Sequence, residues 1–124
     1  MYKVYLAKLK RTDAFPKCVY KVGITGSRDA MTRLNYSGAD EPNPINKTFP
    51  DIKVMNSIVV KDKETAEYIE SNIMKTIQSD ERRFHNWYEP TQFSGVTETR
   101  KWNYEEVQHI FYLMGEYKDK YSII

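Results

Sequence analysis

The sequence has almost none of the residues that build disulfides or zinc sites. Cys18 is the only cysteine among 124 residues, and the two histidines are His85 and His109. A single cysteine cannot form an internal disulfide, and one cysteine with two histidines argues against a structural zinc site. Any bound metal must therefore rely on oxygen ligands.

Long hydrophobic runs and a large excess of one charge are also lacking. No apolar segment approaches the roughly 20 residues that a membrane helix needs, and the N-terminal sequence MYKVYLAKLK has no signal-peptide core. The net charge is +2, well short of a protein that coats nucleic acid, although it leaves room for a local basic face. We expect a cytoplasmic protein without membrane association.

What the sequence does contain is the composition of a folded domain. Hydrophobic residues make up 40% of the chain and charged residues 29%, which is typical of soluble globular proteins. A chain of 124 residues can bury roughly two-thirds of its unfolded surface around one core. We therefore expect one domain over residues 1–124.

Two segments near the N-terminus alternate with period two and predict an antiparallel hairpin. They are residues 2–9, YKVYLAKL, and residues 18–25, CVYKVGIT. The alternation assigns Val4, Leu6, Tyr20 and Val22 to a core face. The opposite face then gathers Lys3, Tyr5, Lys21, Gly23 and Thr25.

The rest of the chain predicts a third strand and three helices. The helices are expected over 28–36, 63–78 and 104–118, with Ser27, Asp62 and Asn103 as their N-caps and Glu106 completing a capping box with Asn103. A third strand is expected over 52–60, while 37–50 and 79–102 are irregular. The predicted fold class is α+β, a small three-stranded antiparallel sheet flanked by helices.

Glu70 interrupts the apolar stripe of the second predicted helix. It lies about 40° from Ala66 and within about 60° of Ile73 and Ile77 around the helix. A buried carboxylate needs a cation or a metal, because burying it alone costs several kcal/mol. The other interpretation is a partly exposed carboxylate bridged to a lysine or arginine.

The order of four features resembles the GIY-YIG nuclease superfamily. In that family the first strand ends in G-I-Y, the second ends in Y-I-G, an arginine follows on the first helix, and a glutamate follows on a later helix. Here KVY (Lys3, Val4, Tyr5) stands at the first motif and KVG (Lys21, Val22, Gly23) at the second. Arg33 and Glu70 stand at the positions of the family's arginine and glutamate. The residues of the second motif are similar to those of a phage-type branch, in which lysine replaces the second-motif tyrosine.

The resemblance implies a small metal-dependent DNA endonuclease encoded by a phage or mobile element, acting in the host cytoplasm. It implies that Glu70 holds one Mg²⁺ or Mn²⁺ ion, Tyr5 is the general base, Lys21 favours its phenolate, and Arg33 clamps the phosphate. Gly23 marks a bend of the strand or a close approach, and His85 and Thr25 are accessory candidates. Met74 stands where this branch often has a histidine.

The partner implied by this resemblance is double-stranded DNA. Basic side chains offered as backbone contacts are Lys47, Arg82, Arg83, Arg100 and Lys101. A solvated surface explains these residues equally well. Sequence specificity must come from the long loop, the aromatic segment around Trp87, a homodimer or a partner protein, or else be low.

Two other functions stay open on the sequence. One is a catalytically weak or inactive GIY-YIG-like module that binds nucleic acid or a host protein, which Met74 and the modest charge favour. The other is a structural α+β protein in which Glu70 forms a buried ion pair with Arg33 or Lys21.

Overall fold

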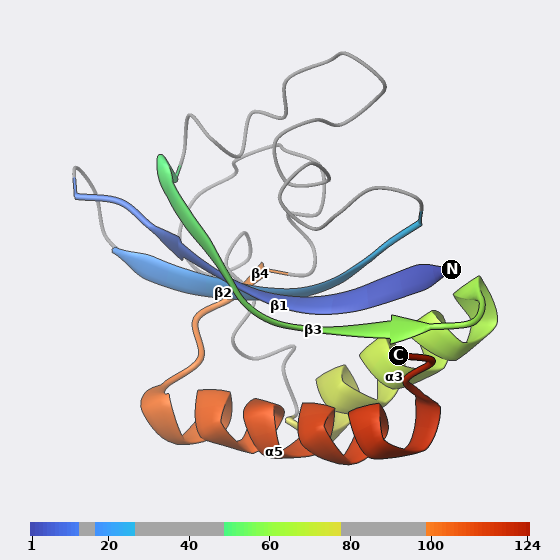
Figure 1. Cartoon of the computed structure of the whole chain (residues 1–124). Helices are drawn as coiled ribbons and strands as arrows, with labels where there is room; N and C mark the ends of the chain where they lie inside the picture. The colour runs from blue at the N-terminus through green and yellow to red at the C-terminus, as the bar shows by residue number, and fades with distance from the viewer. Residues whose placement is uncertain (13–16, 27–48, 78–98) are drawn as a thin grey trace.

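The fold is built on a four-stranded antiparallel sheet in the order β3-β1-β2-β4 (Figure 1). A computed structural model describes residues 1–12, 17–26, 49–77 and 99–124. The strands are β1 (Tyr2–Lys10), β2 (Cys18–Thr25), β3 (Asp51–Val60) and β4 (Thr99–Arg100). The helices are α3 (Lys63–Thr76) and α5 (Tyr104–Tyr121). The α+β class agrees with the prediction.

The predicted hairpin of β1 and β2 is present, with pairs running from Lys3 opposite Thr25 to Lys10 opposite Cys18. β1 is one of the two inner strands and also pairs antiparallel with β3, where the register shifts between Leu6 and Ala7. Such an irregularity bends and twists the strand locally. Figure 1 shows β3 starting well away from the helices and curving down toward them.

The number of strands in the prediction was wrong, because the described sheet has four strands rather than three. The fourth, β4, pairs with β2 through Tyr20 opposite Arg100 and Lys21 opposite Thr99. It lies in the stretch predicted to be irregular. A strand of two residues is too short to show a period of two, so only its tertiary pairing reveals it.

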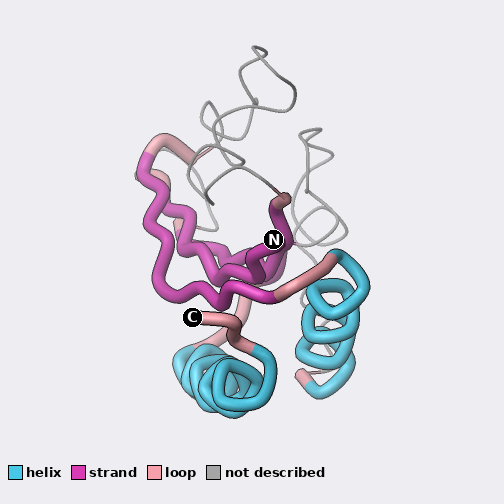
Figure 2. The backbone as a smooth tube through the Cα atoms, turned by 45° about the vertical axis from the view of Figure 1, so that its right-hand side comes forward, coloured by secondary structure: helices cyan, strands magenta, loops and turns pink. Residues whose placement is uncertain are grey.

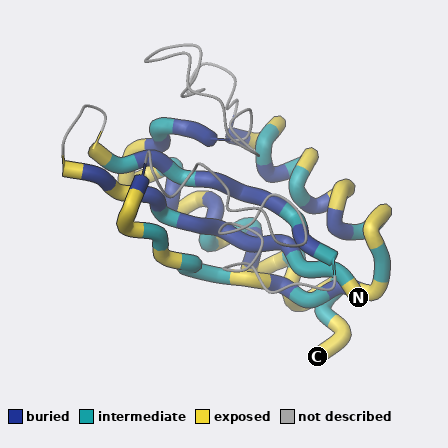
Figure 3. The backbone as a smooth tube through the Cα atoms, turned by 90° about the horizontal axis from the view of Figure 1, so that it is seen from above, coloured by how far each residue is buried: buried dark blue, intermediate teal, exposed yellow. Residues whose placement is uncertain are grey.

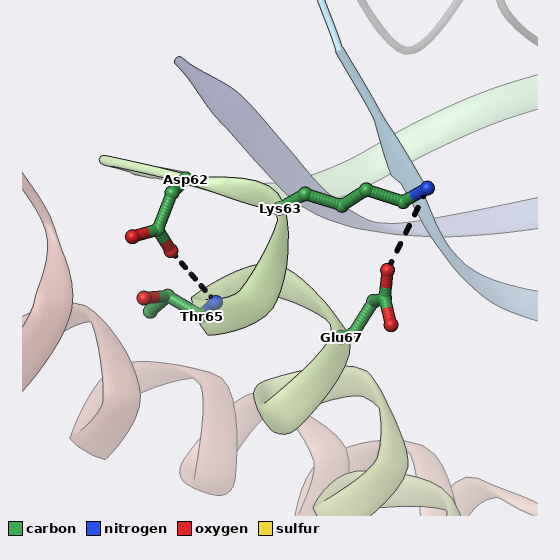
Figure 4. A network of polar contacts seen from close by, with 4 residues as sticks. All are labelled: Asp62, Lys63, Thr65 and Glu67. Atoms are coloured by element: carbon green, nitrogen blue, oxygen red, sulfur yellow. Dashed lines mark hydrogen bonds and ion pairs between the residues drawn. The ribbon is translucent and has the colours of Figure 1, made fainter.

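Both described helices begin at the residues that the sequence indicates. The Asp62 carboxylate accepts a hydrogen bond from the Thr65 backbone N–H at 2.8 Å (Figure 4). Hydrogen bonding from the Thr65 side chain, and then from its backbone, holds the pKa of Asp62 below the ordinary value. Lys63 and Glu67, which are one turn apart on α3, form an exposed ion pair at 3.8 Å. At α5 the predicted capping box is confirmed, since Asn103 and Glu106 exchange hydrogen bonds of 2.9 and 2.8 Å.

The two helices pack on the same face of the sheet, which we call the helix face (Figure 2). The core there joins Val4, Leu6 and Val22 of the sheet to the apolar stripes of both helices. These stripes contain the predicted core residues Ala66, Ile69, Ile73, Val107, Ile110 and Met114, with Ile77 just after α3. Trp102, from the segment predicted to be irregular, is buried in the same core.

The opposite face of the sheet, which we call the far face, is also buried. Tyr5, Ala7, Leu9 and Val19 form a second apolar cluster with Phe49, and none of the five is more than 1% exposed. Figure 3 shows the middle of the sheet as a largely buried band. The alternation predicted one apolar face and one mixed polar face, but both faces of this sheet bury apolar side chains.

Neither α3 nor α5 is long and apolar enough to cross a membrane.

Candidate active site

Tyr5 and Lys21 meet on the far face of the sheet. Tyr5 comes from the middle of β1, and Lys21 comes from β2, where it lies opposite Ala7. The Lys21 ammonium donates a hydrogen bond to the Tyr5 hydroxyl oxygen at 3.1 Å and lies 5.2 Å from the centre of the Tyr5 ring. Tyr5 is 1% exposed and Lys21 5% exposed, so the contact is made almost entirely away from solvent.

Gly23 provides the space that this contact occupies. It lies directly opposite Tyr5 in the hairpin. A Cβ atom at this position would lie 2.5 Å from the Lys21 ammonium nitrogen, 2.6 Å from the Tyr5 hydroxyl oxygen and 2.7 Å from the ring carbon that bears it. These are shorter than any van der Waals contact, so a side chain at residue 23 would push the pair apart. The glycine in KVG is therefore explained by a close approach rather than by a turn.

The arrangement has a definite chemical capability. The Lys21 ammonium and the Tyr5 hydroxyl place a cation and a proton-transfer group side by side. A tyrosine in such a position is a candidate for general acid–base chemistry. The ammonium can equally bind an anionic oxygen that comes close to the phenol.

Two buried threonines lie on the same face of the sheet as the pair. Thr25, an accessory candidate from the sequence, lies on β2 on the same side as Lys21 and is 4% exposed. Thr99 is fully buried and lies opposite Lys21 in β4. Thr99 was not predicted as a site residue, because its position beside Lys21 depends on β4, which has no sequence signature.

Tyr20 is adjacent to Lys21 in sequence but belongs to the helix face. It is half-buried and packs against the helix-face core. Burial and the neighbouring Cys18 thiol raise the pKa of Tyr20 to about 12. A phenol with so high a pKa keeps its proton, which is the opposite of what a general base needs. The prediction that Tyr20 points toward the core agrees with this placement.

Glu70 lies half-buried on α3, whose core residues pack against the helix face. The contacts that join Tyr5, Lys21 and Gly23 are on the far face. Within the described residues no group of three or more histidine, cysteine, aspartate or glutamate side chains is placed to hold a metal ion. In its chemistry Glu70 fits Mg²⁺, since one carboxylate suffices for an ion that keeps several of its waters.

The remaining predicted residues divide into two groups. Arg33, Lys47, Arg82, Arg83 and His85 lie outside the described residues. Arg100 and Lys101 are described, but neither is an open surface cation: Arg100 is 3% exposed, and Lys101 is half-buried. The Arg100 guanidinium donates to the Thr99 carbonyl oxygen at 3.1 Å. The surface position that the sequence suggested for Arg100 therefore differs from its place in the fold.

Comparison with known proteins finds no matching family model, no similar curated protein and no similar solved structure. The resemblance to GIY-YIG nucleases rests on the order and spacing of the motifs in the sequence.

Proposed function

We propose that this protein is a small metal-dependent DNA endonuclease of the GIY-YIG kind. The observation that carries the proposal is the buried hydrogen bond between Lys21 and Tyr5, with Gly23 leaving room for it. These residues stand at the two motifs that suggested the family. A lysine and a tyrosine in direct contact, each from a different motif, support a role for Tyr5 as the general base in phosphodiester hydrolysis.

The reaction needs an activated water, neutralisation of charge on the phosphate and help for the leaving oxygen. Tyr5 takes a proton from the attacking water, and the Lys21 ammonium lowers the free energy of the phenolate that does so. Arg33 neutralises charge on the non-bridging phosphate oxygens through its planar fork.

Glu70 is the residue proposed to hold a divalent cation. Its carboxylate is a hard oxygen ligand suited to Mg²⁺ or Mn²⁺. When bound, such an ion supplies Lewis-acid stabilisation of the oxygen that leaves.

Plasmid nicking in Mg²⁺ or Mn²⁺ tests the proposal. Tyr5→Phe removes the hydroxyl and keeps the ring, and Glu70→Gln removes the charge and keeps the shape. We expect Tyr5→Phe to lower the rate at least a hundredfold, in the range for loss of a general base, and Glu70→Gln to lower the rate through loss of the ligand to the cation. Lys63→Gln, at an exposed position on α3, is the control and should cleave like the wild type. Equal nicking by all four proteins would remove these residues from the mechanism.

The burial of the pair favours a second candidate function. Tyr5 and Lys21 are so little exposed that the ammonium–phenol contact also suits a structural role, in a module that binds nucleic acid or a host protein without cutting. Under this alternative, wild-type protein binds duplex DNA or a host protein and shows no nicking at any concentration of either metal. Tyr5→Phe then changes only the free energy of unfolding.

A further inference from the structure

A row of basic and aromatic side chains crosses the sheet at the end away from the N-terminus. In the strand register Lys53 of β3 lies opposite Lys8 of β1, Lys8 lies opposite Tyr20 of β2, and Tyr20 lies opposite Arg100 of β4. Two residues further along β1, Lys10 lies opposite Asp51 of β3 on one side and Cys18 of β2 on the other. Residues directly opposite each other in antiparallel strands project from the same face of the sheet.

The face is fixed by the neighbours of these residues. Ile52 and Val54 pack against the cluster on the far face, so Lys53 between them projects from the helix face. Leu6 and Tyr20 belong to the helix-face core, which places Lys8 on that face as well. We call Lys8, Lys10 and Lys53 the lysine row.

The lysine row is accessible to a partner. Lys10 and Lys53 are exposed, and Lys8 is half-buried. Figure 1 shows the start of β3 well above the helix layer, and Figure 3 shows exposed segments at this end of the sheet. Buried cores hold the middle of the sheet on both faces, so this end is where its helix face can meet another molecule.

The lysine row also carries an electrostatic cost. Like charges directly opposite in a sheet destabilise it, and Lys8 faces Lys53 in this way. Asp51, opposite Lys10, is the one acid among these pairs. Across the part of the chain that the structure describes, none of the three lysines forms an ion pair. At the nearby start of α5, the Glu106 side chain is engaged in the capping box.

We infer that the lysine row binds the phosphate backbone of nucleic acid. Charge complementarity is the argument: an anionic partner removes the repulsion between Lys8 and Lys53, and lysine ammonium groups donate hydrogen bonds to phosphate oxygens. The choice of nucleic acid among polyanions rests on the proposed function. The lysine row and the Tyr5–Lys21 pair lie on opposite faces, so this surface adds to the affinity without taking part in the chemistry.

Binding of a fluorescent duplex, followed by anisotropy over a series of salt concentrations, tests this inference. The variant is Lys8→Gln/Lys53→Gln. The matched control is Lys63→Gln/Lys118→Gln, which removes the same charge from exposed positions on α3 and α5. Loss of two phosphate contacts should reduce the slope of log K against log salt by about 1.8. The affinity should fall at least tenfold at low salt, and the control should stay within twofold of the wild type.

Further measurements separate this inference from the proposed endonuclease. At limiting duplex, Lys8→Gln/Lys53→Gln should nick more slowly than the wild type because it binds more weakly, while Tyr5→Phe should bind normally and fail to nick. If the wild type does not nick but the lysine variant binds more weakly than the wild type, the proposed function fails and the binding surface stands. Without DNA, the lysine variant should unfold at a higher temperature at low salt, since the repulsion is gone, and this also shows that it is folded.

Two results would overturn the inference. One is an equal loss of affinity in the lysine variant and the control, which would mean that net charge alone is responsible. The other is tighter binding of the wild type to phosphatidylserine vesicles than to duplex, with the loss in the lysine variant confined to the vesicles.

Discussion

At Gly23 a single added methyl group would clash with both Tyr5 and Lys21 of the candidate active site. In Gly23→Ala the new methyl group must displace the Lys21 ammonium and the Tyr5 ring, because all three nearest atoms lie within 2.7 Å of it. The end of the lysine can move, but the tyrosine ring is fixed in the far-face core. We expect a loss of about 1–3 kcal/mol in the free energy of unfolding, measured by urea denaturation, and a loss of nicking.

Two other glycines serve as controls for Gly23→Ala. At Gly26 the nearest atom to an added Cβ is a Tyr2 ring carbon at 3.4 Å, and at Gly115 no atom lies within 4 Å. Gly26→Ala should be close to neutral. Gly115→Ala, inside α5, should stabilise the protein by about 0.5–1 kcal/mol. If all three substitutions behave alike, close packing at residue 23 is not the reason for the glycine.

The hydrogen bond between Lys21 and Tyr5 predicts an asymmetry between its two partners. Tyr5→Phe leaves a buried ammonium without its acceptor and should cost about 1–3 kcal/mol. Lys21→Met removes the charge along with the donor and keeps the length of the chain, so it should cost less. A double-mutant cycle by urea denaturation measures the coupling, expected at about 0.5–3 kcal/mol. Additive effects would contradict a direct interaction.

At the scale of elements, the two helix caps differ in charge. Asp62 caps α3 with a carboxylate whose pKa lies below its ordinary value, mainly through hydrogen bonds from the Thr65 side chain and backbone, whereas Asn103 caps α5 with a neutral amide. A depressed pKa means that the stabilisation is present above the unfolded pKa and is lost as pH falls through the folded pKa.

Thermal unfolding at pH 7 and near pH 2 therefore distinguishes the two caps. Asp62→Ala should lower the melting temperature at pH 7, and its difference from the wild type should shrink on acidification. Asn103→Ala should cost about 0.5–2 kcal/mol at both pH values. A constant deficit for Asp62→Ala would show that the charge of its carboxylate contributes nothing.

The elements that the sequence predicted well are those with local signals. Alternation located β1 and β2, and caps followed by apolar stripes located the starts of α3 and α5. The end of α5 was placed three residues early, since helix ends carry weaker signals than caps. β4 was missed, and with it the position of Thr99 beside Lys21, because the pairing of a two-residue strand is a tertiary event.

At the scale of the molecule, the sequence placed Tyr5, Lys21 and Gly23 on one face, and the strand register does bring them together. The sequence could not predict that these residues are buried. Alternation says which residues share a face, but it does not say what covers that face, and the far face carries a second core around Phe49. The same limit applies to Arg100, whose charge suggested a surface position and whose place in β4 is buried.

The end of the chain gives a last prediction, which concerns the outer edge of the sheet. After α5 the chain continues extended from Ser122, and the Ile123 backbone N–H donates to the Val59 carbonyl oxygen at 3.0 Å. Among the described strands β3 lies at an edge of the sheet, and an unpaired edge is a template for association with another chain. Deleting residues 122–124 should cost about 1 kcal/mol and should produce concentration-dependent dimers in sedimentation velocity experiments.

Ile123→Pro separates the lost hydrogen bond from the lost residues. Proline removes the N–H donor, and the extended backbone of Ser122, with ψ of 136°, suits a residue that precedes proline. Ile123→Pro should therefore associate like the truncated chain, whereas Ile123→Ala should stay monomeric. If the truncated chain stays monomeric too, the edge must be protected by the exposed charge of Lys53 and the irregular register near Val54, since both features discourage strand pairing.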